Sequence, residues 1–409
     1  MYSALHTTKD SSPLFPMRSS ALHHIELGVS NGKKIASYFL DKLGYSLRGR
    51  RETAVNTQWV IGSHKSIFLV TENKKLYRPE FVPFSHFSSS VNQVDTVFNV
   101  ALEVKNLEHV TNKMQKDGGM LFHPVTEVED KAGKVRYSIV GSCCGNIIHT
   151  LLDKSQYQGS FLPTFQESVA ARGEEPFTHV DHLTYVCRPG ESQNIIKWYQ
   201  NCLGMQKFQM NPTEDLNEGL VIKGGVGMRL RVMDYWPCAE SGISNANPDA
   251  MDDTSLKIVI AESLPENENA HISAFLEGHG GPGLQHIGLA TNDVTSCVDA
   301  MIRKQVQFRA PPKAYYQNER KRKEIQAAGY SIDEFQRLGI LLDSEADTAD
   351  ITSRDKYLLQ IFTTPLFNEE TFFMEVMQRK GARGFGAGNV TALARSIEEE
   401  NLTLKAIKL

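Results

Sequence analysis

Three residues that lie far apart in the sequence are candidates for a shared metal site. His182 and His286 each hold the third place in a short apolar segment, and Glu375 is the one ionisable residue in the apolar run 371–377. A carboxylate that is buried without a partner is very unfavourable. Two imidazoles and one carboxylate on one side of a metal leave coordination positions open, which is typical of non-haem Fe(II) sites for oxygen chemistry. These residues predict one Fe(II) per chain.

Ordinary packing is the alternative for the same residues. Either histidine alone is more often a core residue than a ligand, and Glu375 could pair with Arg379 or Lys380 instead. The three residues form no local metal-binding motif, because they are too far apart along the chain. The metal site is favoured because they stand at matched places in a repeated pattern.

The repeat consists of four apolar strands that each run into an amphipathic helix. The strands are expected at 23–29, 98–104, 180–186 and 284–290. After each helix come two or three strand candidates, such as 220–222 with 228–233, and Ser192 is expected to cap the third helix. Each unit is therefore predicted to be a βαβββ module. An open sheet of this kind cannot bury its apolar face alone, so four modules predict an α+β fold of two half-barrel domains with helices outside.

Two domains are expected between two tails. The predicted ranges are a disordered or targeting tail at 1–20, an N-terminal domain at 21–153, a linker at 154–178, a C-terminal domain with the iron site at 179–400 and a tail at 401–409. The linker is placed where glycine and proline are frequent and periodicity is weak. The last module carries an insert at 310–338 with a helical pattern, expected to form a lid or rim.

The N-terminal half serves as an internal control for the metal site. His24 and His149 are assigned to the first and last of the corresponding positions, but Val100 is assigned to the place of the middle histidine. This half is therefore predicted to hold no metal and to act as a support.

Composition excludes several classes of protein. Of the 409 residues, 41% are hydrophobic and 22% are charged, and the formal net charge of -4 provides no electrostatic surface for nucleic acid. The basic run 320–323 lies among acidic residues and is interpreted as a solvated helix face. No segment has the apolar length of a transmembrane helix or a signal core. The six cysteines lack metal-ligand spacing, which is typical of thiols in a reducing compartment.

The glycine-rich segment 384–389 resembles a phosphate-binding loop only superficially. Too little chain follows it for a dinucleotide-binding βαβ unit. The glycines are instead expected to turn the chain from the strand of Glu375 into a helix at 390–399 that closes the mouth of the cavity.

Several motifs resemble those of the 4-hydroxyphenylpyruvate dioxygenases. They are the segments 280–287, 311–316, 359–362, 373–379 and 384–389, and the likeness extends over about residues 20–400. The resemblance implies two vicinal-oxygen-chelate domains (the glyoxalase/bleomycin-resistance-like fold) and places His182, His286 and Glu375 on the family's iron ligands. It also implies 4-hydroxyphenylpyruvate and dioxygen as substrates. The 2-oxo acid group of the substrate itself is decarboxylated, so no separate 2-oxoglutarate is needed.

The same resemblance assigns residues to the substrate cavity. Polar groups that orient the substrate are expected at Gln285, Gln360 and Asn389, and aromatic walls at Phe362, Phe373 and Phe385. Plain core packing is an equal alternative for each phenylalanine alone. The chain departs from the family at four further cavity positions, where serine, asparagine, glutamine and phenylalanine are replaced by Leu230, Ala261, His271 and Val390.

The replacement at Val390 bears on the product. In the hydroxymandelate synthases, which are similar to the dioxygenases, this wall residue is also smaller than phenylalanine. A valine gives the decarboxylated substrate room to rotate, so that its benzylic carbon rather than its ring is presented for hydroxylation. The leading hypothesis is therefore a 4-hydroxymandelate-forming dioxygenase. Formation of homogentisate, as in tyrosine catabolism, is the alternative, and a metal-binding but catalytically silent homologue is the third.

Three segments are more similar to an animal branch of these dioxygenases. They are 159–163, 261–265 and 338–343. This likeness implies a mitochondrial location and a role in making the precursor of the ubiquinone head group, with a cytoplasmic location as the alternative. A homodimer is left open, as is cleavage of the first 20 residues.

Overall fold

The computed structural model of the chain describes residues 22–74, 82–86, 94–210, 214–223, 225–235, 255–345, 356–369 and 371–392. The predicted tails lie outside these residues, as does most of the predicted helix 390–399. The described part of that helix begins at residue 387, three residues earlier than predicted.

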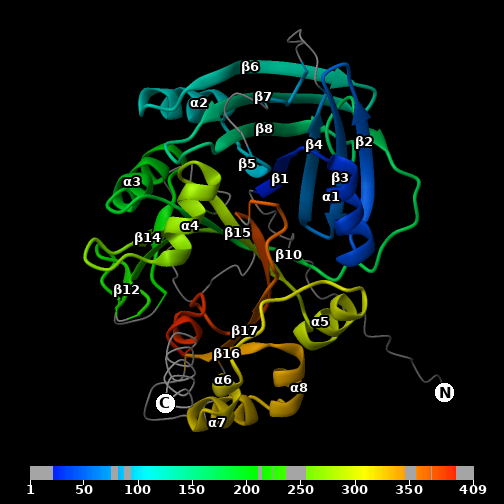
Figure 1. Cartoon of the computed structure of the whole chain (residues 1–409). Coiled ribbons are helices and arrows are strands. Elements are labelled where there is room, and N and C mark those ends of the chain that lie inside the picture. Colours follow the sequence, from blue (N-terminus) through cyan, green and yellow to red (C-terminus); the bar gives the residue numbers. More distant parts are fainter. Residues whose placement is uncertain are drawn as a thin grey trace, which may run out of the picture.

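The first half of the chain forms a curled mixed sheet with helices outside (Figure 1). Its strand order is β6-β7-β8-β5-β1-β4-β3-β2-β9. The elements in chain order are β1 (Leu22–Val29), α1 (Gly32–Ser37), a π-helical turn (Tyr38–Lys42), β2 (Ser46–Glu52), β3 (Asn56–Ser63), β4 (Ser66–Asn73), β5 (Thr96–Glu103), α2 (Leu107–Lys116), β6 (Leu121–Asp130), β7 (Gly133–Gly141), β8 (Ile148–Tyr157) and β9 (Gln166–Glu167).

The second half forms a similar curled sheet, in the order β11-β13-β14-β10-β15-β18-β17-β16, with β12 paired to β13. Its elements are β10 (His179–Val186), α3 (Ser192–Leu203), β11 (Gln206–Phe208), β12 (Leu220–Ile222), β13 (Met228–Tyr235), β14 (Leu256–Ser263), α4 (Ala270–His279), β15 (Gly283–Ala290), α5 (Val294–Arg303), α6 (Lys313–Gln317), α7 (Glu319–Ala327), α8 (Ile332–Leu338), β16 (Leu341–Ser344), β17 (Tyr357–Phe362) and β18 (Phe373–Lys380).

Both sheets repeat one pairing pattern. In the first, β1 is antiparallel to β5 and parallel to β4, and β5 is parallel to β8. In the second, β10, β15, β14 and β18 pair in the same way. The predicted α+β fold of two half-barrels built from βαβββ modules is therefore confirmed. β8 continues to Tyr157 and β9 pairs with β2, so the first sheet includes residues of the predicted linker 154–178.

The insert predicted at 310–338 contains α6, α7 and α8, which lie together at the end of the molecule away from the first sheet (Figure 1). The basic run on α7 is only partly the solvated face that the sequence suggested. Lys321 is buried, where its ammonium group donates to Glu324 at 2.8 Å and to the carbonyl of Leu342 at 2.9 Å. A buried ammonium needs such partners because an unpaired charge is costly to bury.

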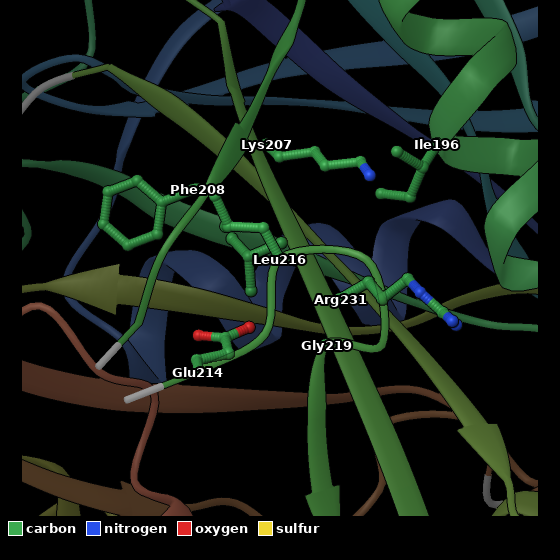
Figure 2. Close-up of a pocket in the computed structure, with 8 residues that line it drawn as sticks. Ile196, Lys207, Phe208, Glu214, Leu216, Gly219 and Arg231 are labelled. Atoms are coloured by element: carbon green, nitrogen blue, oxygen red, sulfur yellow. The ribbon is translucent and has the colours of Figure 1, made fainter. Parts of the chain in front are cut away.

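Helix α3 packs closely on the second sheet. The hollow between α3, β11 and β13 has a volume of about 10 Å³, with Ile196, Phe208 and Arg231 among its lining residues (Figure 2). A volume of that size holds about one water molecule. This hollow between helix and sheet is therefore too small for an organic ligand.

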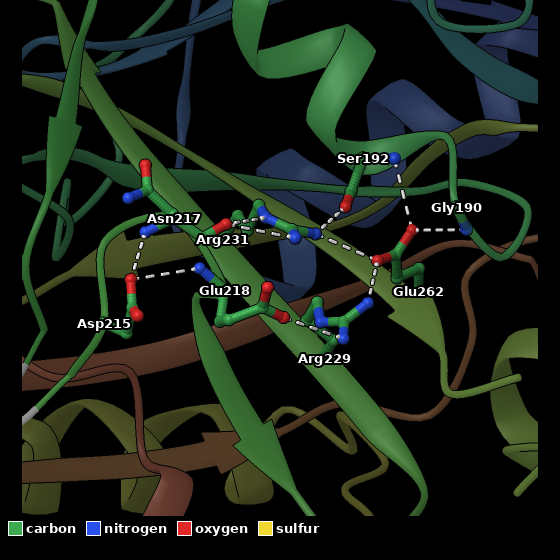
Figure 3. Close-up of polar contacts among 8 residues, drawn as sticks. All are labelled: Gly190, Ser192, Asp215, Asn217, Glu218, Arg229, Arg231 and Glu262. Atoms are coloured by element: carbon green, nitrogen blue, oxygen red, sulfur yellow. Dashed lines mark hydrogen bonds and ion pairs between the residues drawn. The ribbon is translucent and has the colours of Figure 1, made fainter. Parts of the chain in front are cut away.

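A buried carboxylate fastens the start of α3 to the sheet (Figure 3). Glu262 of β14 accepts hydrogen bonds from the backbone N–H groups of Gly190 and Ser192 at 2.9 and 3.2 Å. It also accepts from Arg229 at 3.0 Å and Arg231 at 2.9 Å. Burial opposes ionisation of Glu262, but these donors outweigh it and lower its pKa.

The cap predicted for this helix at Ser192 is wrong. Glu191 holds the N-cap position without a side-chain cap bond, and the Ser192 hydroxyl accepts a hydrogen bond from Arg231 instead. The helix N-terminus still meets an acceptor, because Glu262 reaches it from a strand 70 residues away in the chain.

We expect Glu262→Gln to lower the free energy of unfolding by about 3 kcal/mol, since it leaves two arginines beside an uncharged amide in a buried position. Glu218→Gln is the matched control, because Glu218 pairs with the same Arg229 but its side chain is 64% exposed; its effect should stay within about 0.5 kcal/mol. Urea unfolding midpoints measure both. Equal midpoints for the two variants would contradict this account of Glu262.

Candidate metal centre

The three predicted ligands come together on neighbouring strands. His182 lies on β10, His286 on β15 and Glu375 on β18, and these strands are adjacent in the order β10-β15-β18. His182 and Glu375 both pair in register with Gly288 of the central strand. A Cβ atom at Gly288 would lie 2.3 Å from Cε1 of His182, so only glycine leaves room for the imidazole there.

The ligand atoms are close enough to share one ion. Nε2 of His182 lies 3.3 Å from Oε2 of Glu375, and Nε2 of His286 lies 3.9 Å from the same oxygen. All three ligand atoms fall within 4.8 Å of one another. Bonds of about 2.0–2.2 Å place neighbouring ligands roughly 3 Å apart at a right angle. Among the described residues, no other group of three histidine, cysteine or acidic side chains meets this spacing.

The chemistry of the three donors fits a metal. The side chains of His182 and Glu375 are 2% and 3% exposed, and Oε1 of Glu375 has no hydrogen-bond partner in the described part of the chain. The alternative that Glu375 pairs with Arg379 is not what the structure has, because Arg379 binds Asp181. Burial, His182 and Arg309 hold the pKa of His286 well below its usual value, so this imidazole is neutral, as a metal ligand must be.

The residue directly before each of the two histidines contacts Nδ1, the ring nitrogen that does not face the candidate metal position. Nδ1 of His182 donates to Asp181 at 2.9 Å, and Nδ1 of His286 lies 3.3 Å from the amide oxygen of Gln285. Such partners orient a ligating imidazole and leave Nε2 free for the metal. Gln285, expected to orient the substrate, is therefore placed against a ligand. The role of Asp181 was missed, although its place beside His182 was visible in the sequence.

Asp181 is held in turn by Arg379, which donates to its two carboxylate oxygens at 2.7 and 2.9 Å. Burial alone would raise the pKa of Asp181, but Arg379 and His182 hold it well below its usual range. Arg379 also donates to the backbone carbonyls of Ala382 and Gly384. One arginine thus links the first ligand to the segment that leads into the last helix.

The three predicted aromatic wall residues surround the ligands. Phe373 stacks on His286 with ring centroids 4.8 Å apart, and Phe385 meets the edge of His182 at 5.0 Å. Phe362 pairs in register with Glu375, and its ring centroid lies 6.4 Å from that of His286. Each of the three is only partly buried, as expected of a wall that borders a cavity.

Gln360 and Asn389 add buried amides on the same side. Both residues are fully buried, and the Asn389 oxygen accepts a hydrogen bond from the hydroxyl of Tyr315 at 2.9 Å. The Asn389 nitrogen and both polar atoms of Gln360 have no partner among the described residues. A buried amide without a partner in the protein is expected to form a hydrogen bond with a ligand or an ordered water.

The residues that depart from the family pattern lie in two places. Leu230 and Ala261 pair in register, and they share an apolar cluster with Val390 and Phe385. Their neighbours Arg231 and Glu262 face α3, so the alternation of the strands turns Leu230 and Ala261 toward the inner face. His271 instead lies on α4 with an exposed side chain, where partial desolvation of its ring and the charge of Arg309 lower its pKa.

The strand pairing of the N-terminal half changes which of its residues are equivalent to the three metal ligands. His24 pairs with Ala101 as His182 pairs with Gly288, so His24 does correspond to His182. By the same register, however, Asn99 and Thr150 stand at the places of His286 and Glu375, not Val100 and His149. Asn99 and Thr150 are hydrogen-bonded at 2.8 Å, whereas His149 turns to Tyr199 at 2.9 Å.

Comparisons with known proteins agree with the fold. Residues 179–326 match the model of the Glyoxalase/Bleomycin resistance protein/Dioxygenase superfamily. The chain is 34% identical to the 4-hydroxyphenylpyruvate dioxygenase-like proteins of Rattus norvegicus and Homo sapiens, over 93% of this chain and 96% of each relative. It is 27% identical to the 4-hydroxyphenylpyruvate dioxygenase of Yarrowia lipolytica, over 92% of this chain and 91% of that one. A variant of 4-hydroxymandelate synthase from Streptomyces coelicolor has the same fold, with a TM-score of 0.70 and 22% identity over 94% of this chain and all of that one.

Two curled half-barrels with a two-histidine, one-carboxylate site define a protein of the glyoxalase and dioxygenase superfamily with a candidate metal centre. Within it, the chain belongs to the 4-hydroxyphenylpyruvate dioxygenase-like family. The resemblance inferred from its motifs is thereby confirmed. No helix among the described residues is both long and apolar enough to span a membrane.

We expect the purified protein to retain one equivalent of divalent metal after desalting, as measured by elemental analysis. Glu375→Gln and His286→Gln should each weaken metal binding by more than about 100-fold, since even changes to the partners of ligands typically cost 10- to 100-fold. His24→Gln is the matched control, because His24 holds the equivalent place in the first sheet, and it should retain the metal. Full metal content in Glu375→Gln would contradict the assignment.

Proposed function

We propose that this protein is an Fe(II)-dependent dioxygenase that converts 4-hydroxyphenylpyruvate and dioxygen to 4-hydroxymandelate and carbon dioxide. One dioxygen supplies both oxygen atoms that the products gain. One atom enters the carboxylate left by decarboxylation and the other enters the new hydroxyl group. The observation that carries the proposal is the pairing of a complete His182, His286 and Glu375 site with a small wall residue, Val390, on the same inner face.

His182, His286 and Glu375 would hold Fe(II), which supplies dioxygen activation when it is bound. The protein's own residues position the substrate. The 2-oxo acid end belongs beside the three ligands, and Phe362, Phe373 and Phe385 form an aromatic wall for the phenyl ring. The unpartnered amide atoms of Gln360 and Asn389 are suited to hydrogen bonds with polar groups of the substrate.

The apolar cluster around Val390 supports hydroxymandelate over homogentisate. Leu230, Ala261 and Val390 belong to one cluster with Phe385 and Ala387, and none of the three can hydrogen-bond a substrate with its side chain. Because this cluster offers only apolar contacts, the part of the substrate that lies against it can rotate within the space available. With valine rather than a phenyl ring at position 390, that rotation brings the benzylic carbon toward the metal site.

An aerobic incubation of the protein with Fe(II), ascorbate and 4-hydroxyphenylpyruvate tests the proposal. We expect 4-hydroxymandelate as the main product, separated by chromatography from homogentisate, which has the same mass. Glu375→Gln is the control and should form neither compound. Homogentisate as the main product would support the alternative activity. Metal binding without oxygen consumption for any aryl pyruvate would support the catalytically silent homologue.

We expect Val390→Phe to raise the share of homogentisate, because a ring at this position restricts rotation of the substrate side chain. Val390→Ile is the matched control: it adds volume without an aromatic ring and should leave hydroxymandelate predominant. The product ratio measures both effects. An unchanged ratio in Val390→Phe, at normal metal content, would refute the role given to Val390.

A further inference from the structure

One side of the metal site is more open than the others. The side chains of His182 and Glu375 are 2% and 3% exposed, whereas that of His286 is 16% exposed. His286 stacks on Phe373, which is itself only partly buried. Solvent therefore approaches the ligands past His286 and Phe373, and a substrate is expected to enter on that side.

An arginine stands on this open side. The guanidinium carbon of Arg309 lies 5.2 Å from the centre of the Phe373 ring, and the backbone N–H of Arg309 donates to the carbonyl of Phe362 at 2.8 Å. The residue is exposed. The backbone of Arg309 is thus hydrogen-bonded to Phe362. Its side chain lies over Phe373, the residue whose ring stacks on His286.

The charge of Arg309 has no counter-ion in the described part of the chain. No aspartate or glutamate there lies within ion-pair distance of its guanidinium, whereas Arg379, which stacks on Phe385, is committed to Asp181. The entrance therefore carries a cation that has no acidic partner among the residues that the structure describes.

We propose that Arg309 binds the carboxylate of the incoming 2-oxo acid and turns it toward the metal ligands. This inference rests on the proposed function for the identity of the substrate. A carboxylate has about four lone-pair positions, so it can ligate a metal and accept a hydrogen bond from an arginine at the same time. The planar guanidinium matches a carboxylate and keeps its charge at any physiological pH. Arg309 thereby selects anionic substrates at the entrance.

The test uses the Co(II)-loaded full chain, whose visible spectrum reports ligand binding at the metal. Oxalate is the anionic probe and imidazole the neutral one, and neither needs the aromatic cavity. Arg309→Gln should weaken oxalate binding by about threefold to tenfold and leave imidazole binding unchanged. Arg309→Lys should retain most of the oxalate affinity because it keeps the charge.

Arg303→Gln is the matched control. Arg303 lies on α5, and its side chain is 78% exposed and paired with Asp299. Arg303→Gln therefore has the same net charge as Arg309→Gln but leaves the entrance unchanged. Its oxalate affinity should equal that of the unmodified chain. Equal oxalate affinities in Arg309→Gln and Arg303→Gln would overturn the proposal. So would an equal loss of oxalate and imidazole binding in Arg309→Gln, since that would mean damage to the metal site.

Turnover of 4-hydroxyphenylpyruvate separates this inference from the proposed function. With the Fe(II) protein, Arg309→Gln should raise KM by a similar factor, weaken its dependence on salt concentration and largely retain kcat. If neither the unmodified chain nor any variant turns over 4-hydroxyphenylpyruvate, the proposed function fails. The oxalate comparison then still decides whether Arg309 binds anions at the entrance.

Discussion

The buried carboxylate of Glu375 is the constraint on which the C-terminal half depends. It lies within a central strand at 3% exposure, where an ionised group without a partner is very unfavourable. The guanidinium of Arg379, four residues further along the same strand, is committed to Asp181 by two hydrogen bonds. A metal ion held together with the two imidazoles would compensate this charge. Metal binding is therefore expected to contribute to folding stability as well as to chemistry.

The same arginine connects the ligands to the wall of the cavity. Arg379 holds Asp181, which orients His182, and its guanidinium carbon lies 4.7 Å from the centre of the Phe385 ring. It also binds backbone carbonyls in the turn before that ring. The segment with Asn389 and Val390 follows directly. The positions of the first ligand and of Phe385 are thus linked by one charged network, so a change in either is expected to affect the other.

Each half of the molecule has a buried carboxylate, and the two carboxylates have different surroundings. In the first sheet, Glu26 is fully buried, and its carboxylate accepts hydrogen bonds from Thr71 at 2.6 Å, Asn99 at 2.8 Å and Gln58 at 3.3 Å. Burial raises the pKa of Glu26, and these neutral donors partly offset that effect. Asn99 stands where the second half has His286. In the first sheet, side chains therefore bond to one another at the place equivalent to the candidate metal site of the C-terminal half.

The sequence alone determined the four βαβββ modules and the three candidate ligands. Strand and helix periodicity are local properties, and a lone glutamate in an apolar strand is visible without any structure. The family resemblance followed from motifs that are also local. Residues such as Phe362 and Gln360 could be assigned to the cavity only through that resemblance.

Only the tertiary structure decided which side chains face each other. The pairing of β5 with β1 and with β8 places Asn99 and Thr150, rather than Val100 and His149, at the positions equivalent to the ligands, and a difference of one residue turns a strand's side chain to the opposite face. The acceptor at the start of α3 came from Glu262 on a distant strand rather than from Ser192. The place of Arg309 over Phe373 likewise depends on how the loop after α5 lies against the sheet. Contacts between segments far apart in the chain follow from packing, which no local pattern records.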